Sequence, residues 1–468
     1  MAVATNRQLV RLTDALRRSV RAGRVVTAGP DYEAGRRLWN GAVSSRPAVI
    51  VRCVDPAEVR AAVLAAGEFG VPLSVRGGGH DWAGRALSDG GLTLDLSGMR
   101  QVTVDPVAQV AVVSGGATAA DLAAAAEPFG LTAVTGSAGS VGMAGLTLGG
   151  GYGPLGGRFG LALDNLVSAD VVLADGSIVT ADPEREPDLF WAVRGGGGNF
   201  GVVTSMRVRL HRVPALLSGM VMYPWDQAEK VLTGLSDVLA ESPDELTVQS
   251  GVLPGPGGDD PVVFLAPTWS GDDGVAGGRA MARLDPLGTP LVSQIAPTTT
   301  RRMLAAVDAQ FPFGRHAEIR PRSVPSLTAG VRDVLRLAGS TLTSPRSAVS
   351  LHSLHGAAAR VPVRDTAFGN RDPHLMIEII ACWEPGDPRA SDHRAWASNL
   401  TSALEPEALR GSYPNLLGRG EVAQIAHAYG PNTARILALK HRFDPDDAFR
   451  AIPLPLSPWR SRDRASAW

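Results

Sequence analysis

The sequence predicts a mixed fold of the α+β class, divided into more than one lobe. At 468 residues the chain is too long for a single ordinary hydrophobic core, so we expect two or three lobes. Residues 48–75 predict a β-α-β unit, because two short apolar runs flank a helix that begins at Asp55-Pro56 and ends at Gly70. Alternating residues at 101–104 and 109–113 predict strands, which we expect to form a meander with a strand at 92–96.

Further elements follow in order along the chain. An alanine-rich helix is expected at 117–129, and Asp175-Gly176 predicts a hairpin between strands at 167–173 and 177–180. A short helix at 187–193 precedes a strand at 202–210. From about Pro214 the glycines disperse and prolines become more frequent, which indicates a second region. We expect it to contain a helix at 225–239 and strands at 246–253, 262–268, 347–355 and 374–383, before a last helix at 434–443.

Composition excludes several classes of function. The 45 basic and 46 acidic residues nearly cancel and form no dense basic run, which argues against nucleic acid as a partner. No stretch of about 18 apolar residues predicts a membrane span, and the arginine-rich N-terminus predicts a surface helix instead of a signal peptide. Cys53 and Cys382 are too few for a disulfide framework or a cysteine zinc site, so no metal and a cytoplasmic location are expected. The expected partner is a small molecule or a second copy of the chain, as a homodimer.

Glycines gather in three clusters, at 77–79, 136–153 and 195–201. Glycine-rich turns present backbone N–H groups to phosphates without side-chain obstruction, as a dinucleotide requires. Two G-x-G-x-x-G matches occur, at 151–156 and 196–201, but neither closes a strand and opens a helix. The pattern therefore disfavours a nicotinamide cofactor.

Together these clusters resemble a known family. The sequences Val75-Arg-Gly-Gly-Gly-His80, 136–145 with 149–153, Asp164-Asn165 and 189–203 are similar to the FAD-binding domain (PCMH type) of the vanillyl-alcohol-oxidase superfamily. Segments 413–416, 429–430 and 440–450 resemble the end of its berberine-bridge-enzyme-like branch, and we expect a bacterial member. The resemblance implies an FAD-binding domain of two subdomains at 1–212 and a substrate-binding α/β domain with an antiparallel sheet at 213–405. Residues 406–468 would pack back on the FAD-binding domain.

The resemblance also assigns residues to the cofactor. His80 is expected to bond to the 8α-methyl carbon of the flavin, which retains the cofactor and raises its potential. Many relatives form a second link through a cysteine, but Ala138 occupies that place here, so a single covalent bond is expected. Val141 matches a position where a small residue leaves room for oxygen, so molecular oxygen is the expected electron acceptor. The residues expected to bind FAD are Arg76, Gly77, Gly78, Gly79, His80, Thr135, Gly136, Ser137, Gly139, Ser140, Val141, Gly142, Gly145, Gly149, Tyr152, Gly198, Asn199, Gly201, Val203, Tyr413 and Asn415.

The catalytic residues depart from the family pattern. Many relatives use a tyrosine base that closes a Tyr-x-Asn-Tyr motif, but here the motif ends at Leu416, and Arg360 lies near the place of an acidic partner. Four other residues are candidates for proton transfer: Tyr152, His352, His355 and Glu378. The two histidines could equally be structural. Alternation with its isoleucine neighbours could point Glu378 to solvent, and His374 is expected in a loop.

We expect an FAD-dependent oxidase that acts on a bacterial secondary metabolite, such as a polyketide or a glycosylated intermediate. A hydride would pass from a C–H bond, by default that of a carbinol, to flavin N5, and oxidative cyclisation is a close variant. One alternative is a non-redox cyclase that retains FAD as a structural element. Another is a flavin-binding protein without catalysis. Residues 215–400, which would line the substrate pocket, carry no motif that identifies the substrate.

Overall fold

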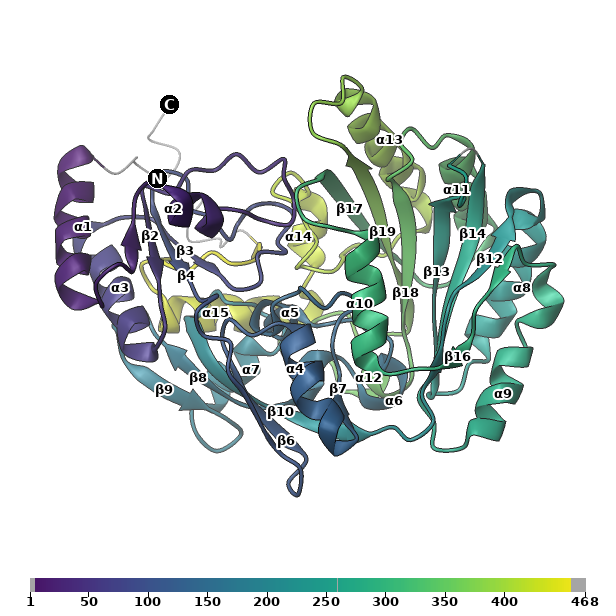
Figure 1. Ribbon diagram of the computed structural model, residues 1–468, viewed down its shortest axis with the longest axis horizontal. Coiled ribbons are helices and arrows are strands. Elements are labelled where there is room, and N and C mark those ends of the chain that lie inside the picture. The colour runs from purple at the N-terminus through teal and green to yellow at the C-terminus, as the bar shows by residue number, and fades with distance from the viewer. Residues whose placement is uncertain (1–4, 259, 456–468) are drawn as a thin grey trace.

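A computed structural model describes residues 5–258 and 260–455, which form three β-sheets. The first two sheets come from residues 25–212, and the third comes from residues 217–383 (Figure 1). The antiparallel third sheet stands apart from the other two, and helix α10 (Thr300–Gln310) lies at the boundary between them (Figure 1). Helices and strands of both kinds of sheet agree with the expected α+β class.

The first sheet has four strands in the order β1 (Val25–Val26), β2 (Val49–Arg52), β4 (Leu92–Asp95) and β3 (Leu73–Arg76). The predicted β-α-β unit is present as β2, helix α3 (Pro56–Phe69) and β3. The Asp55 side chain accepts a hydrogen bond from the Glu58 N–H at the start of α3, and Gly70 ends the helix with φ of 62°. Helix α1 (Asn6–Ser19) packs against α3, and the short α2 (Pro30–Gly35) precedes β2.

The predicted meander is wrong for its first strand. β4 pairs in parallel with both β2 and β3 in the first sheet, whereas β5 (Val102–Asp105) and β6 (Val110–Ser114) form a hairpin in the second. All four residues of β4 are buried, but β5 alternates between half-buried and exposed residues. A strand covered on both faces belongs in a parallel sheet, so burial distinguishes the two strands where sequence order did not.

The second sheet has the order β5, β6, β10 (Val202–Arg212), β8 (Leu166–Val172) and β9 (Ile178–Ala181), with β7 (Leu131–Ala133) paired to the end of β10. Gly176, at φ of 80°, forms the predicted turn between β8 and β9. The helices of this region are α4 (Ala119–Ala126), η1 (Glu127–Phe129), α5 (Met143–Gly149), α6 (Gly156–Phe159), η2 (Ala162–Asn165) and α7 (Pro187–Val193).

The third sheet has nine strands. Its main order is β15 (Val292–Ser293), β12 (Val221–Pro224), β14 (Pro261–Trp269), β13 (Leu246–Pro254), β18 (Ala348–Leu354), β19 (His374–Trp383) and β17 (His316–Val324), with β11 (Leu217–Ser218) and β16 (Ala296–Pro297) at one side. The helices of this region besides α10 are η3 (Trp225–Gln227), α8 (Ala228–Ala240), α9 (Gly274–Ala282), η4 (Asp285–Leu287), α11 (Ala329–Ser340), α12 (Gly356–Arg360) and α13 (Ala390–Ala403).

The two faces of this sheet have different surroundings. Along β19, Leu375, Ile377 and Ile379 pack into a core with residues of helices α8, α11 and α13. Met376, Glu378 and Ile380 alternate with them and point to the opposite face, toward the first region. Every second residue of β19 therefore points into the space between the third sheet and the first region.

The last described part of the chain returns to the first region. After η5 (Glu405–Glu407), it contains α14 (Val422–His427), η6 (Gly430–Asn432) and α15 (Thr433–Phe443), drawn in yellow beside the elements of the first region (Figure 1). Helix α15 packs on α7, and Ile436 joins the same core as Trp191 and Phe200. This return places residues 413–416 against the glycine clusters.

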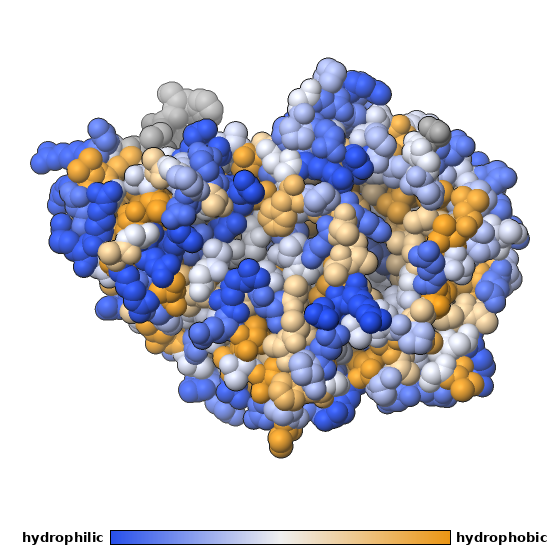
Figure 2. All heavy atoms as spheres, viewed as in Figure 1, coloured by the Kyte–Doolittle hydropathy of each residue, from blue (hydrophilic) through white to orange (hydrophobic). Residues whose placement is uncertain are grey.

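The surface view shows mainly hydrophilic side chains, with hydrophobic ones in small separate groups on this face (Figure 2). Within residues 5–258 and 260–455, every helix is too short or too polar to cross a bilayer.

Candidate active site

A cavity of about 470 Å³ lies between the first region and the third sheet. One side, which we call the glycine wall, is formed by residues of the three glycine clusters at 77–79, 136–145 and 197–201. The opposite side, which we call the sheet wall, is formed by Ser350, His352, Met376, Glu378 and Ile380 of strands β18 and β19. The glycine clusters expected to bind FAD and the candidate proton-transfer residues His352 and Glu378 therefore line the same cavity.

The glycine wall depends on close contact between two backbone loops. A Cβ atom added to Gly78 would lie 2.3 Å from the backbone nitrogen of Gly142, which is closer than real Cβ contacts. On the cavity side the situation is reversed. A Cβ added to Gly145 would meet nothing within 4 Å, and one added to Gly77 would meet only the Gly115 oxygen, at 3.7 Å. The loops are packed against each other behind the wall and are open in front of it.

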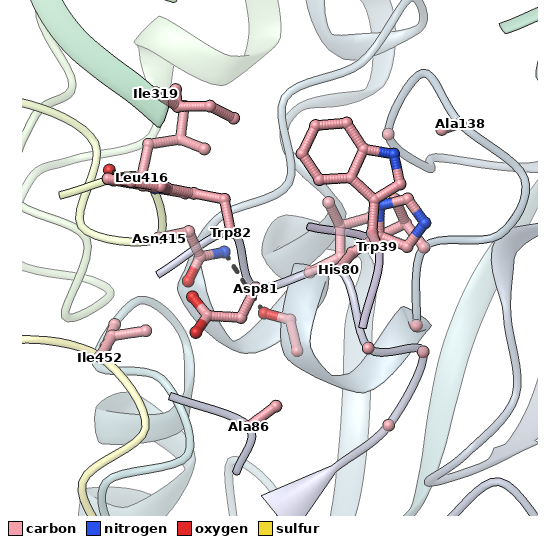
Figure 3. A pocket seen from close by; sticks show the side chains of 18 of the residues that line it. Trp39, His80, Asp81, Trp82, Ala86, Ala138, Ile319, Asn415, Leu416 and Ile452 are labelled. Carbon is pink, nitrogen blue, oxygen red and sulfur yellow. Dashed lines mark hydrogen bonds between the residues drawn. The ribbon is translucent and has the colours of Figure 1, made fainter. Parts of the chain in front are cut away.

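His80 follows the first glycine cluster and lies between two aromatic rings. It stacks on Trp39 with a centroid distance of 5.8 Å (Figure 3). The Phe313 ring is nearly perpendicular to it, with a centroid distance of 5.2 Å. Its Nε2 atom is 2.8 Å from the Ser140 hydroxyl oxygen, and that hydroxyl donates to Asp308 of α10 at 2.6 Å. Desolvation lowers the pKa of His80 to about 4, partly offset by the charge of Asp308, so the ring is neutral near pH 7.

Ala138 lines the cavity on the second glycine loop, at the position where relatives have a cysteine (Figure 3). Cys53 and Cys382 are both buried in hydrophobic clusters behind the lining, and neither is itself a lining residue. Burial also raises the pKa of both thiols, that of Cys382 to about 11. Neither cysteine is placed to react with a group in the cavity.

The segment 413–416 packs on the second glycine cluster. The Tyr413 hydroxyl oxygen accepts hydrogen bonds from the Gly151 N–H at 3.0 Å and from the Asn415 amide at 2.9 Å. Burial raises the pKa of Tyr413 to about 12, so this hydroxyl is not a base near pH 7. Leu416 lines the cavity beside Trp82, whose indole N–H donates to the Leu416 carbonyl at 2.8 Å (Figure 3).

Tyr152 lines the cavity, but its hydroxyl group contacts a residue outside the lining. Its hydroxyl is 2.8 Å from Nε2 of His374, and burial raises its pKa well above the usual value of 10. The expectation that His374 lies in a loop is wrong, because it is the first residue of β19 and is 3% exposed. Its Nδ1 is 2.7 Å from the Asp372 carbonyl oxygen, so the ring is held at both nitrogens and can position Tyr152.

Glu378 and His352 meet on the sheet wall. His352 Nε2 is 3.8 Å from Glu378 Oε1 and 3.2 Å from the Ser350 hydroxyl. Desolvation raises the pKa of Glu378 to about 7 and lowers that of His352 to about 4. Glu378 therefore faces the cavity and not solvent, and it supplies an acidic group at a position other than that of Arg360.

His355 and Arg360 lie outside the cavity lining. His355 directly precedes α12, and its Nε2 is 3.2 Å from the Leu246 carbonyl oxygen, against the backbone of Gly157. Arg360 forms an exposed ion pair with Asp244. We therefore leave His355 out of the proposed proton-transfer group.

Most of the residues expected to bind FAD line the cavity, but six lie behind its surface. Arg76 pairs with Asp95 at 2.9 Å at the base of the first glycine loop, and Gly149 is pressed against Asn415. Asn199 accepts a hydrogen bond from the Ala451 N–H and so holds the segment around residue 451 near the third cluster. The six are Arg76, Thr135, Gly139, Ser140, Gly149 and Asn199.

Several lining residues were not found from the sequence. Trp39, Met220, Gln249, Phe264 and Met376 come from separate parts of the chain and carry no shared motif. Trp39 and Met220 lie between elements, and for the other three the only signal in the sequence is a side chain on the second face of a strand, which does not distinguish a cavity from solvent. The described residues contain no cluster of three or more histidine, cysteine or acidic side chains that could hold a metal ion.

Comparisons with known proteins agree with this geometry. A family model described as an FAD binding domain matches residues 47–182. The FAD-linked oxidoreductase aurO of Gibberella zeae is 31% identical over 456 residues, covering 96% of this chain and 87% of that protein. A crystal structure of 6-hydroxy-D-nicotine oxidase from Arthrobacter nicotinovorans has a TM-score of 0.84 at 29% identity, covering 92% of this chain and 97% of that one. BBE-like 1 of Physcomitrella patens shares the fold, with a TM-score of 0.85 at 24% identity over 95% of this chain and 99% of that one. The chain therefore belongs to the FAD-linked oxidoreductases of the vanillyl-alcohol-oxidase superfamily and is an FAD-dependent oxidoreductase.

Proposed function

We propose that this protein is an oxidase that holds FAD against the glycine wall through a single covalent bond to His80. It oxidises a carbinol carbon of a small, largely apolar natural product, with molecular oxygen as the final electron acceptor. The observation that carries the proposal is the placement of a titratable carboxyl, Glu378, on the wall opposite the glycine loops of one cavity.

The lining fits a flavin dinucleotide. Glycines at 77, 142 and 145 leave backbone atoms exposed to the cavity, and Cβ atoms added to Gly77 and Gly145 would project into open space. Backbone N–H groups of such loops bind phosphates, and apolar residues such as Leu146 and Val203 suit the rings. When bound, FAD supplies a two-electron acceptor that takes a hydride from a substrate and is reoxidised by oxygen.

A single attachment is supported by what surrounds each reactive atom. His80 is neutral near pH 7 and stands at the cavity edge, so one ring nitrogen can act as a nucleophile. Ala138 has no reactive atom, and both cysteines are buried elsewhere. Trp39 stacks on the imidazole, and the Phe313 ring packs against it in a T-shaped arrangement, so both help to fix the orientation of the ring.

Glu378 has the properties of the general base that Leu416 cannot provide. A pKa of about 7 leaves a large fraction of the carboxyl ionised near neutral pH, and its conjugate acid is weak enough for proton transfer to be productive. Glu378 would accept the hydroxyl proton while the hydride leaves the carbinol carbon. The neutral His352 ring, 3.8 Å away, is placed to orient the carboxyl and the substrate hydroxyl.

The charges of the lining restrict the substrate. Among the described lining residues, the two arginines are already bound: Arg85 by Asp81, and Arg450 by Asp447. An anionic substrate would therefore face Glu378 without a cation to offset its charge. Met220, Phe264, Ile319, Met376 and Ile380 add apolar surface, so a neutral compound of secondary metabolism fits better than an acid.

Anaerobic mixing with a compound panel tests this function. The panel contains aromatic and polyketide-like secondary alcohols, 6-hydroxynicotine and xylobiose. The measurement is the loss of the visible absorbance band that gives oxidised flavin its yellow colour. We expect bleaching by a neutral carbinol and recovery of colour with release of hydrogen peroxide when oxygen is admitted. Product formed while the flavin stays yellow would indicate the non-redox cyclase instead.

Glu378→Gln tests the assigned base. We expect the rate of bleaching to fall by about 10² to 10⁴ while the bound flavin is retained. In the wild type, kcat/KM should rise with pH through about 7 as Glu378 loses its proton, and this rise should be absent in the variant. An unchanged pH profile in Glu378→Gln would exclude this residue as the base. Arg360→Ala, outside the lining, is the matched control.

Oxidation at a carbon that bears an amine is a second candidate. A buried carboxylate without a nearby cation on the sheet wall would pair with a substrate ammonium, and a solved relative is a hydroxynicotine oxidase. Preferential bleaching by the amine in the panel would favour this reaction. A homodimer, a cytoplasmic location and oxidative cyclisation stay predictions from the sequence.

A further inference from the structure

We propose that Asp308 and Ser140 form a proton relay that prepares His80 for its covalent bond to the flavin. The inference rests on the covalent link proposed above. It assigns a positioning role to two residues, one of which comes from the region that contains the third sheet. Asp308 lies on α10, whereas Ser140 and His80 belong to glycine loops of the first region.

The hydrogen bonds fix the direction of the relay. The Ser140 N–H and hydroxyl both donate to the same oxygen of Asp308, at 3.1 Å and 2.6 Å. A serine hydroxyl has one hydrogen, so its oxygen can only accept from His80 Nε2, which is 2.8 Å away. The proton of the neutral imidazole is therefore on Nε2, and the lone pair is on Nδ1. Nδ1 is the atom left free to form a bond.

The position of Asp308 is specific to this contact. Among residues 5–258 and 260–455, Asp308 forms no ion pair, and its hydrogen bonds go to Ser140 alone. Leu304, one turn earlier on α10, is buried in the core of the first region, which fixes the helix against the loop. A Cβ added to Gly139 would lie 2.7 Å from the Asp308 carboxyl, so glycine there allows the carboxylate to approach.

The relay accounts for the proton that attachment releases. A bond forms between Nδ1 and the 8α carbon, while one C–H bond of the methyl group and the Nε2–H bond break. Two protons and two electrons are lost in total. Oxygen would take up the two electrons and, with two protons from solvent, become hydrogen peroxide. The Nε2 proton would pass through the Ser140 hydroxyl to the Asp308 carboxylate and from there to solvent, which leaves the alkylated imidazole neutral.

The test compares full-length wild type with Asp308→Asn, Ser140→Ala and Ser140→Thr. Each protein is incubated with FAD under air and precipitated with acid at intervals. Flavin in the pellet and the mass of the peptide containing His80 report the covalent fraction. We expect Asp308→Asn and Ser140→Ala to incorporate flavin about 100-fold more slowly. Ser140→Thr, which keeps the hydroxyl, should restore the rate.

Controls separate this proposal from the covalent link itself. His80→Ala should give a colourless pellet, and Asp333→Asn, an exposed aspartate on α11, should behave as wild type. Flavin that remains bound before acid treatment shows that a variant is folded. Wild-type rates in both Asp308→Asn and Ser140→Ala would overturn the relay while leaving the link intact. A wild-type pellet without flavin would overturn the link and, with it, the relay.

Discussion

The glycine wall of the cavity is made by backbone, whereas the sheet wall is made by side chains. On the glycine wall the important contacts are those where a Cβ cannot fit, as between Gly78 and Gly142. On the sheet wall the groups are His352 and Glu378, which reach the cavity because alternate residues of a strand share a face. Backbone shape holds a cofactor that is the same across a family, and side chains can change with the substrate. Changes in the two walls should therefore have separable effects.

The largest effect is expected from Gly78→Ala. The added methyl would overlap the Gly142 backbone, and neither loop can yield without moving the other, so we expect a loss of about 3 kcal/mol in stability and little bound flavin. Denaturant unfolding and the ratio of flavin to protein absorbance measure the two losses. Gly67→Ala, on the exposed side of α3 with nothing within 4 Å, should instead stabilise the protein slightly. Normal flavin content in Gly78→Ala would contradict the rigid glycine wall.

Glu378→Gln should have a smaller effect on stability, and its size should depend on pH. The pKa of Glu378 in the folded protein, about 7, lies above its usual value of 4.5. The folded state therefore binds this proton more tightly than the unfolded state, and wild-type stability falls as pH rises from about 4.5 to 7. Glutamine does not titrate, so the variant should gain on the order of 2 kcal/mol over wild type between pH 5 and pH 8. Parallel unfolding curves at the two pH values would show that the carboxyl is solvated.

Tyr152→Phe should cost less, because it removes one hydrogen bond where the two walls meet. His374 would lose its partner at 2.8 Å and keep the longer Asn370 contact at 3.3 Å, which costs about 1 kcal/mol. Tyr223→Phe is the matched control, since its buried hydroxyl also donates one hydrogen bond, to the Leu284 carbonyl, in the core of the third sheet. Both variants should lose similar stability, but only Tyr152→Phe should change the flavin absorbance spectrum. Identical spectra would argue against Tyr152 as a neighbour of the cofactor.

Arg360→Ala should have the smallest effect. Its ion pair with Asp244 is exposed to solvent and lies outside the cavity, so we expect almost no change in stability and an unchanged flavin content. Thermal unfolding and the anaerobic bleaching rate provide the check. A large fall in the bleaching rate would mean that Arg360, which lies near the position of an acidic residue in relatives, is part of the active site.

Much of the first region could be predicted from the sequence. The helix between Asp55 and Gly70 and the turn at Gly176 are set by residues next to them in the chain, and both are present as expected. The strand at 92–96 was placed in the wrong sheet, because a strand of four residues does not record which partners it pairs with. Pairing between distant strands is decided by burial in the complete fold.

The sequence by itself determined the glycine wall and the family, because the ability of a loop to bend without a Cβ is a property of adjacent residues. Only the tertiary structure decided that Glu378 faces a cavity, that His374 holds Tyr152, and that Asp308 reaches Ser140 from another part of the chain. The hydrogen bonds of Ser140 with Asp308 and of Tyr152 with His374 join residues that are 168 and 222 positions apart in the sequence. Alternation along a strand fixes the face of the sheet on which a side chain lies. Whether that face meets solvent, a core or a cavity depends on how the regions pack.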